Sequence, residues 1–415
     1  MDITINGALF CTQLGMSLMQ TFFMFYYVKV FLNIYKIDQF WFGVAQILFA
    51  IWNTINDPLF GYAQDVSITW FHCRKKVISI LGPCLAGSFL VLWFPWNSMD
   101  ESSLPYVAGC HLIFGLFFYD AFYSCISVAW SALFAETTCS KSERISALKF
   151  SQFAVLLSVN IVPVTEKLTD GLNNFRAFQC IGVVIAVLAL LCFKVTGSLR
   201  YQTISVHEDF SSATPLQEES KEKILNVFKI TKQILARHDF RAITITYFLH
   251  ACRSTAHLNF AVIATEILIP EQVMIKGSWE MSLFYAACTL IPQLFVILSG
   301  KTIITIGIAS VIMKSFMASM IASVFVIMFG YNRPYLIILF MFFDSISVHS
   351  IAPLYQVLLA DYIDEDMALF SRQKPISTII YSLAALLVRP AQSIAPFIIV
   401  MILTHYGYKV TIKSS

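Results

Sequence analysis

Eleven long apolar segments, separated by short polar breaks, constrain this chain more than any other feature of its sequence. A helix needs about 20 mostly apolar residues to cross the hydrocarbon core of a bilayer. Because lipid cannot hydrogen-bond an open backbone, such segments are expected to be helical. They cover residues 6–33, 40–63, 77–96, 105–135, 147–165, 176–196, 240–266, 279–299, 303–329, 334–359 and 375–404.

The composition agrees with a membrane environment. Hydrophobic residues make up 58% of the chain and charged residues 13%, whereas a soluble domain is roughly 45–50% apolar and about 25% charged. The net charge of +3 implies no nucleic-acid partner. The ten cysteines stand mostly inside apolar runs, without the spacing of metal ligands. We therefore expect an all-α membrane protein whose partner is the lipid bilayer, with buried thiols and no metal.

One long polar interval divides the apolar segments into six before it and five after it. Residues 197–239 are rich in Ser, Thr, Glu and Lys, and their second part, 221–237, has the amphipathic spacing of a surface helix. Lys and Arg are about threefold enriched on the side that holds the N-terminus and this interval, which predicts that this side is cytoplasmic. We predict an N-terminal six-helix bundle over 1–196, a cytoplasmic linker over 197–239 and a C-terminal helical bundle over 240–415.

A short pattern recurs in the fourth and tenth apolar segments. In each, an intramembrane Asp is followed after a similar interval by an Ala–acid pair and then by an Arg. The pattern begins at Asp120 in the fourth segment and continues after it with Glu136 and Arg144; it begins at Asp344 in the tenth segment and continues after it with Asp361 and Arg372. Parallel repeats of this kind are typical of transporters built from two halves, with the substrate site near the middle of the membrane.

Several ionisable residues lie inside the apolar segments, where each costs about 2.5–3.5 kcal/mol at the centre of the bilayer. They are Asp57, Asp120, His250, Arg253, His257, Lys314, Asp344, His349 and Arg389. The balance of acids and bases predicts mutual pairing across a central polar cavity. The alternative is a set of static pairs that only fix the packing of the helices, and Lys314 is the residue that best fits this alternative.

The second apolar segment holds the densest polar group. Asn53 and Asp57 lie one helical turn apart on one face, and Asn56 lies between them. Their oxygens suit a small hard cation or a proton. Pro58 removes a backbone donor and frees the carbonyl of Thr54 as a further oxygen. The alternative is an Asn- and Asp-rich kink that neighbouring helices satisfy.

A candidate gate follows this group. Gly61 permits a close approach of helices, and Asp65 and Arg74 can pair at the cytoplasmic rim. Such a latch would stabilise one face of an alternating-access cycle.

Three motifs resemble a known family. Residues 52–65 resemble the helix-two signature of the glycoside–pentoside–hexuronide:cation symporters, the melibiose permease-like branch of the major facilitator superfamily. Residues 358–377 and 382–393 are similar to the motifs of that branch in and after helix ten, and in helix eleven, where Arg389 replaces a Lys. Over residues 5–408 the chain resembles the transmembrane protein 180 group, orphan members of this branch.

The resemblance implies two bundles of six helices and a set of binding residues. The cation site of the family maps to Asn53, Asn56 and Asp57, and its sugar-binding acids map to Gln13 and Asp120. Asn53 and Gln13 stand where the family has acids, so sodium–melibiose symport is not carried over. We expect about 11 spanning helices, with the last helix of the family missing.

These observations favour a secondary transporter of a small polar solute that works by alternating access. The coupling ion would be H⁺ or Na⁺, with H⁺ preferred, and no cofactor is expected. Asp344 and Arg389 would join Gln13 and Asp120 at the solute.

Two alternatives are a lysolipid transporter and a transport-incompetent receptor or scaffold, the latter with a protein partner at the linker. The sequence contains no HExxH, GxSxG or Walker-type loop, so we expect no enzyme. The plasma membrane is the expected location, with an endomembrane as the alternative.

Overall fold

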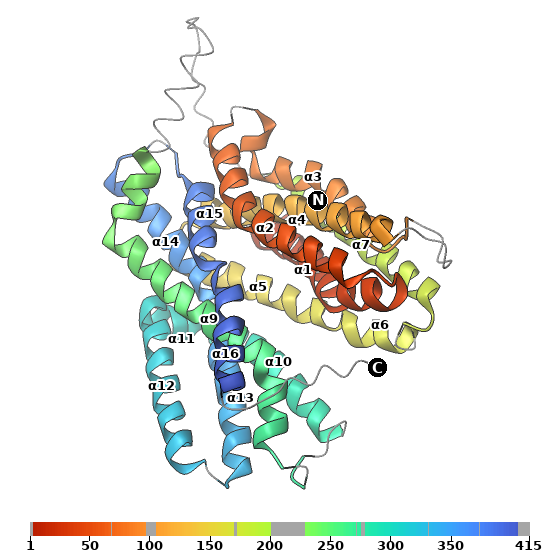
Figure 1. The fold of residues 1–415 in the computed structure, drawn as a ribbon. Coiled ribbons are helices and arrows are strands. Elements are labelled where there is room, and N and C mark those ends of the chain that lie inside the picture. Colours follow the sequence, from red (N-terminus) through yellow and green to blue (C-terminus); the bar gives the residue numbers. More distant parts are fainter. Residues whose placement is uncertain are drawn as a thin grey trace, which may run out of the picture. The chain divides into compact units, whose positions relative to one another are not determined.

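The computed structural model describes residues 3–67, 69–96, 105–169, 172–200, 229–270, 272–274, 279–330, 332–372 and 374–405. Within these ranges, helices occupy all eleven segments predicted from the sequence (Figure 1). Of the predicted surface helix over 221–237, residues 221–228 lie outside the described residues, and 229–236 are helical.

The helices before the linker match the first six predicted segments. They are α1 (Ile5–Lys29), α2 (Gln39–Val66), α3 (Arg74–Val91), α4 (Pro105–Thr137), α5 (Lys141–Val159) followed by α6 (Ile161–Thr169), and α7 (Phe175–Gly197). Polar side chains fix several of their starts. Thr4 caps α1, and Ser140 forms a capping box with Glu143 at the start of α5.

The helices after the linker match the last five segments, and three of those segments are broken into two helices. They are α9 (His238–Leu268), α10 (Trp279–Leu298), α11 (Gly300–Ile306) with α12 (Ile308–Phe329), α13 (Pro334–Ile351) with α14 (Leu354–Leu369), and α15 (Ser377–Val388) with α16 (Ala391–His405). Gly307 makes the break between α11 and α12, where its φ of 89° favours glycine.

Seven helical stretches of the described chain are long and apolar enough to cross a membrane by length and composition. The long helices α2 and α9 are not among these seven. Both carry polar groups in their interiors: Asn53, Asn56 and Asp57 in α2, and His250, Arg253 and His257 in α9. These internal polar groups lower the mean hydropathy of α2 and α9.

The chain packs as two compact units. Unit 1 contains 1–237 and 359–386, and unit 2 contains 238–358 and 387–415. In unit 1, α1 packs against α5 and α7, and α4 packs against α2 and α3. In unit 2, α13 packs against α9, α10 and α12, and α16 packs against α9. The division into bundles over 1–196 and 240–415 stays a prediction.

The core of unit 1 is aromatic. The ring centroids of Phe22 and Phe178 lie 4.7 Å apart, and Trp93 lies edge-on to both rings at 5.3 Å. Such pairs contribute about 0.5–1.5 kcal/mol each beyond the area they bury. This cluster holds α1, α7 and the segment that follows α3 against one another.

Candidate functional site

The predicted cation-binding residues lie on α2, against α4. Asn56 is fully buried and its side-chain amide donates a hydrogen bond to Oδ2 of Asp120 on α4. Asp57 is also buried, and Asn53 is half-buried one turn earlier. The structure therefore brings Asn56 and Asp120 together, and we call these four residues the α2–α4 group.

The other predicted solute residues are spread over the two units. Gln13 lies on α1 in unit 1, where its amide donates to Ser17 Oγ one turn further along, at 2.8 Å. Asp344 and Arg389 belong to unit 2. Arg389 is half-buried between α15 and α16. Convergence of Gln13, Asp120, Asp344 and Arg389 on one solute stays a prediction.

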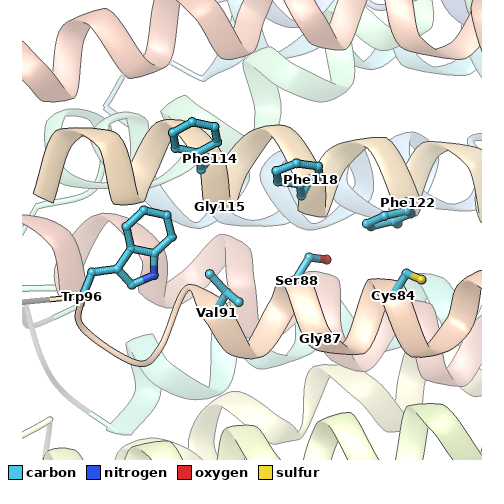
Figure 2. Close-up of a pocket in the computed structure, with 9 residues that line it drawn as sticks. All are labelled: Cys84, Gly87, Ser88, Val91, Trp96, Phe114, Gly115, Phe118 and Phe122. Atoms are coloured by element: carbon cyan, nitrogen blue, oxygen red, sulfur yellow. The ribbon is translucent and has the colours of Figure 1, made fainter. Parts of the chain in front are cut away.

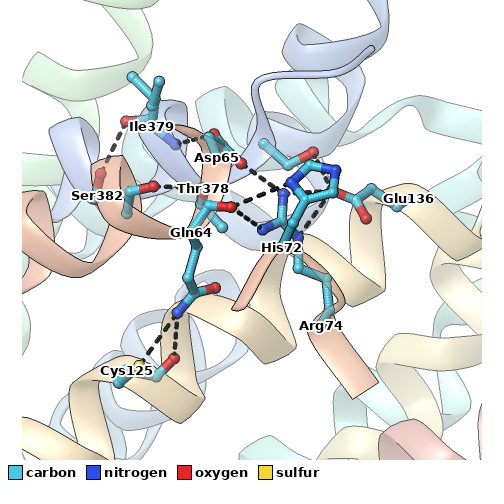
Figure 3. Close-up of polar contacts among 11 residues, drawn as sticks. Gln64, Asp65, His72, Arg74, Cys125, Glu136, Thr378, Ile379 and Ser382 are labelled. Carbon is cyan, nitrogen blue, oxygen red and sulfur yellow. Dashed lines mark hydrogen bonds and ion pairs between the residues drawn. The ribbon is translucent and has the colours of Figure 1, made fainter. Parts of the chain in front are cut away.

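A second polar site surrounds Arg74, at the start of α3 (Figure 3). Its side chain is 2% exposed, and its guanidinium donates to Asp65 Oδ1 at 2.5 Å and to Glu136 Oε1 at 3.2 Å. It also donates to the backbone carbonyl of Gln64 at 3.2 Å. Asp65 and Arg74 thus form the ion pair that their spacing predicts, whereas their part in gating stays a prediction.

The same acids hold the start of α15. Oδ2 of Asp65 accepts a hydrogen bond from the backbone amide of Ile379 at 2.9 Å, and Glu136 accepts one from Ser377 Oγ at 3.0 Å. Thr378 Oγ1 donates to the carbonyl of Gly61 at 2.8 Å (Figure 3). A helix N-terminus carries a partial positive charge that favours nearby carboxylates. The acids of α2 and α4 therefore hold α15 at its favourable end.

Arg144 makes the corresponding connection to α14. Its guanidinium forms ion pairs with Asp361 and Asp364, and its Nε donates to the carbonyl of Thr138 at 3.1 Å. Arg144 and Asp361 lie 217 residues apart in the sequence. We call the contacts of Gly61, Asp65, Glu136 and Arg144 with α14 and α15, together with the Arg74 guanidinium that bridges Asp65 and Glu136, the latch. All of them lie inside unit 1.

Sequence reasoning missed half of the latch. The repeat marked Glu136, Arg144 and Asp361, but it indicated equivalent positions and not partners. In the structure, Arg144 of the first repeat pairs with Asp361 of the second. Asp364 had no signal apart from its place in the acidic motif over 358–377.

The fit at Gly61 gives a testable prediction. A Cβ at this position would lie 2.2 Å from Ser382 Oγ and 2.7 Å from the carbonyl oxygen of Thr378. We expect Gly61→Ala to push α15 from α2 and to destabilise the protein by at least about 1 kcal/mol, measured by thermal unfolding in detergent. Gly43→Ala, in the same helix, is the control, because a Cβ there meets nothing within 4 Å. Equal Tm values for the two variants would show that the close approach is unimportant.

Unit 2 contains a separate charged group. Arg253 of α9 forms an ion pair with Asp344 of α13, and His257 Nδ1 lies 2.8 Å from the other carboxylate oxygen of Asp344. One of the expected pairs between intramembrane acids and bases is therefore present within this unit. No group of three or more His, Cys, Asp or Glu side chains arranged to hold a metal occurs in the part of the chain that the structure describes.

An apolar groove of about 410 Å³ lies between α3 and α4. Figure 2 shows the phenylalanines of α4 along one side and Val91, Ser88 and Cys84 of α3 along the other, with Trp96, which follows α3, at one end. Gly87 widens the groove, since a Cβ there would meet nothing within 4 Å. The lining contains no charged side chain and none of the predicted site residues. This groove is suited to hydrocarbon and not to a polar solute.

These helices, with their internal charges and their polar latch, define a class: multi-pass α-helical membrane proteins of the transporter type. The chain belongs to the MFS/sugar transport protein family, because the sequence model of that family matches residues 9–415. The resemblance seen in the sequence motifs is thereby confirmed at the level of the superfamily.

Two curated relatives are similar over nearly the whole chain. Transmembrane protein 180 of Gallus gallus is 24% identical over 422 residues, which cover 96% of this chain and 80% of that protein. Transmembrane protein 180 of Mus musculus is 25% identical over 422 residues, which cover 94% and 78%. The similarity to the transmembrane protein 180 group agrees with the sequence motifs.

Solved structures show the same fold at low identity. The proton:xylose symporter XylE matches with a TM-score of 0.60 and 14% identity, over 97% of this chain and 87% of that one. The human organic anion transporter MFSD10 matches with a TM-score of 0.66 and 12% identity, over 96% and 93%. These matches establish the major facilitator fold.

Proposed function

We propose that this protein is a secondary transporter that moves a small polar solute by alternating access, coupled to a cation. The latch is the observation that carries the proposal. It joins α14 and α15 to helices that precede them by more than 200 residues, through ion pairs and single hydrogen bonds. Contacts of this kind can break and re-form at a modest free-energy difference, which an alternating-access cycle requires.

The α2–α4 group is the proposed coupling site. It offers two carboxylates, Asp57 and Asp120, and two amides, Asn53 and Asn56. Asn56 uses its amide to hold Asp120, and Asp57 directly precedes Pro58 inside α2. A site with few carboxylates binds sodium weakly, whereas a single carboxylate can still take up and release a proton. We therefore favour H⁺ over Na⁺.

Uptake into proteoliposomes tests this assignment. A panel of labelled hexoses, pentoses, amino acids and monocarboxylates is screened with an imposed pH gradient or Na⁺ gradient. We expect Asp57→Asn to lower gradient-driven accumulation at least about tenfold, because an amide cannot exchange a proton in this range. Asp38→Asn is the matched control, since Asp38 precedes the same helix, is exposed and makes no capping hydrogen bond. Accumulation that is indifferent to Asp57→Asn for every active solute would remove Asp57 from the mechanism.

One observation favours a lysolipid as the transported molecule. The groove between α3 and α4 has the volume and the hydrocarbon lining for part of an acyl chain. If lysolipid is the cargo, Gly87→Leu should fill the groove and reduce uptake of a fluorescent lysophosphatidylcholine. Uptake that Gly87→Leu leaves unchanged would exclude the groove from transport.

In this proposal the protein catalyses no reaction. It resides in the plasma membrane, and surface biotinylation of cells that express the full chain would test that location. The linker over 197–239 is the proposed site for a protein partner, and its residues 201–228 lie outside the described residues. A partner that binds this linker, together with failure of every solute to drive uptake or to alter thermal stability, would favour the receptor or scaffold function instead.

A further inference from the structure

Five ionisable side chains gather where α9 packs against α13 in unit 2. His250, Arg253 and His257 lie three and four residues apart, so they share one face of α9. Asp344 and His349 come from α13, which is packed against α9. We call these five residues the α9–α13 cluster. It contains one carboxylate, one guanidinium and three imidazoles.

Each oxygen of the Asp344 carboxylate contacts a basic side chain. Nη2 of Arg253 donates to Oδ1 of Asp344 and also to Ser319 Oγ of α12, the latter at 2.9 Å. Nδ1 of His257 lies 2.8 Å from Oδ2. The ring of His349 stands edge-on to that of His257, with 5.7 Å between centroids. Both oxygens of the acid therefore already have a basic side chain as partner.

Three nitrogen atoms of the same cluster make no hydrogen bond to the described residues. Nη1 of Arg253 and both ring nitrogens of His250 are shielded from solvent and have no hydrogen-bond partner among the residues that the structure describes. His250 is 1% exposed, and its ring lies against Phe316 and Tyr355. A buried polar group without a partner costs about 1–3 kcal/mol, so buried groups of this kind are rare in native proteins.

A purely structural role does not account for this arrangement. The pair of Arg253 and Asp344 is enough to join α9 to α13, and an apolar ring would pack between Phe316 and Tyr355 better than an unpaired imidazole. His250 and Nη1 of Arg253 belong to residues one helical turn apart. Together they present donors that an acceptor with two oxygens can satisfy.

The geometry points to the α9–α13 cluster as the binding site for the carboxylate group of a monoanionic solute, with Arg253 and His250 as its ligands. This inference rests on the proposed function and names the class of solute. A guanidinium binds carboxylates through two parallel hydrogen bonds, which suits Arg253 when it turns from Asp344 to the solute. One positive charge released from Asp344 matches one negative charge on the solute.

Proton uptake accompanies this exchange. Before binding, the charges of Arg253 and Asp344 balance each other. After binding, Arg253 balances the solute carboxylate, and Asp344 is left with His257 alone. A charged carboxylate without a cation is costly in this environment, so one proton from the solvent binds at Asp344 for each solute bound.

The surrounding elements bring further charged and titratable groups. They are Lys314 on α12, Glu280, Tyr285 and Cys288 on α10, Arg389 before α16 and His405 on α16. Of these, Lys314 is connected to the cluster through the groove that it shares with Ser315 and Ser347. The hydroxyls of Ser315 and Ser319 each lie within 2.8 Å of that of Ser347, and Ser319 accepts from Arg253.

Binding by the purified full chain in detergent tests the inference. The probes are acetate, L-lactate and benzoate, with acetamide, L-lactamide and benzamide as neutral analogues of the same shape. We expect at least one carboxylate to raise the Tm by several degrees and its amide to have no effect. Because one proton binds with the anion, the apparent Kd should rise with pH, by up to about tenfold per pH unit.

Three variants separate recognition from folding. His250→Phe should keep or raise the Tm without ligand and should lose the response to the carboxylate. Arg253→Gln combined with Asp344→Asn removes both charges of the pair together and should also abolish the response. Arg333→Gln removes an exposed arginine at the start of α13 and should respond like the wild type. A carboxylate response that persists in His250→Phe and in the double variant, or a response to no carboxylate, would overturn the inference.

The experiments distinguish a failure of the carboxylate site from a failure of the proposed transport function. Carboxylate binding that depends on the cluster, without any uptake into proteoliposomes, would support this site and contradict the proposed function. Coupled uptake of neutral solutes that His250→Phe leaves unchanged would support the proposed function and overturn this site.

Discussion

Replacing Arg74 by Gln should destabilise the protein by about 3–5 kcal/mol, the typical effect of removing one partner of a buried ion pair. Arg74 is enclosed and faces two carboxylates, those of Asp65 and Glu136. Without the guanidinium, both acids repel each other and keep only a hydrogen bond each from the start of α15. Thermal unfolding in detergent, with urea titration where it is reversible, measures the loss.

A surface ion pair of the same unit provides the control. Lys29 and Glu166 lie 3.3 Å apart with 48% and 33% of their side chains exposed. We expect Lys29→Gln to cost less than about 1 kcal/mol. Combining Arg74→Gln with Glu136→Gln should recover part of the loss, because it removes one of the two unpaired acids. If Arg74→Gln costs no more than Lys29→Gln, the latch is solvated and is not the stable closure proposed above.

The helical segments and their order were predictable from the sequence. Bilayer thickness fixes the length of an apolar run, so hydropathy alone located the segments within a few residues. It did not locate the breaks inside three of the last five segments, such as the one between α13 and α14. The breaks fall at Gly307, at Pro353 and at Pro390, and a hydropathy average over a long apolar run does not register single helix-breaking residues.

Local pairs were predictable and distant pairs were not. Asp65 and Arg74 are near each other in sequence, and their pairing follows from the short turn between α2 and α3. Arg144 and Asp361 pair across 217 residues of sequence, and helical periodicity carries no information on such long-range contacts. The same limit applies to Asn56 and Asp120, whose residues were both selected although their hydrogen bond was not.

The α9–α13 cluster illustrates a different limit. The sequence marked every ionisable residue in it as costly, and it predicted that acids and bases would pair. Only the structure distinguishes the paired atoms of Arg253 and Asp344 from the unpaired nitrogens of His250. The functional hypothesis depends on that distinction, because a fully paired cluster would be explained by packing alone.

Replacing Arg144 by Gln should open the latch more often while leaving the fold intact. Arg144 holds two acids of α14 that are 28% and 48% exposed, so we take about 1.5 kcal/mol for each of these charged hydrogen bonds, at the lower end of their range. The sum of about 3 kcal/mol corresponds to about 150-fold in the opening equilibrium.

Hydrogen exchange at the start of α15 reports that equilibrium directly. The amide of Ile379 is protected by its hydrogen bond to Asp65 and exchanges only when the latch opens. We expect about 150-fold faster exchange in peptides that contain this amide, with little change in the aromatic core around Phe22. Lys141→Gln, an exposed change three residues earlier in the same helix, should leave the exchange rate unchanged.

A charge reversal makes the assignment specific. Arg144→Glu alone should open the latch further than Arg144→Gln, because it places a carboxylate opposite Asp361 and Asp364. Adding Asp361→Arg to Arg144→Glu recreates an ion pair of opposite orientation and should restore much of the protection of Ile379. If the single reversal leaves exchange at Ile379 unchanged, α14 and α15 are held by packing and not by the latch. The proposed cycle would then need a different switching element. Apolar packing within a unit changes between two arrangements only when some interaction has a different free energy in each of them.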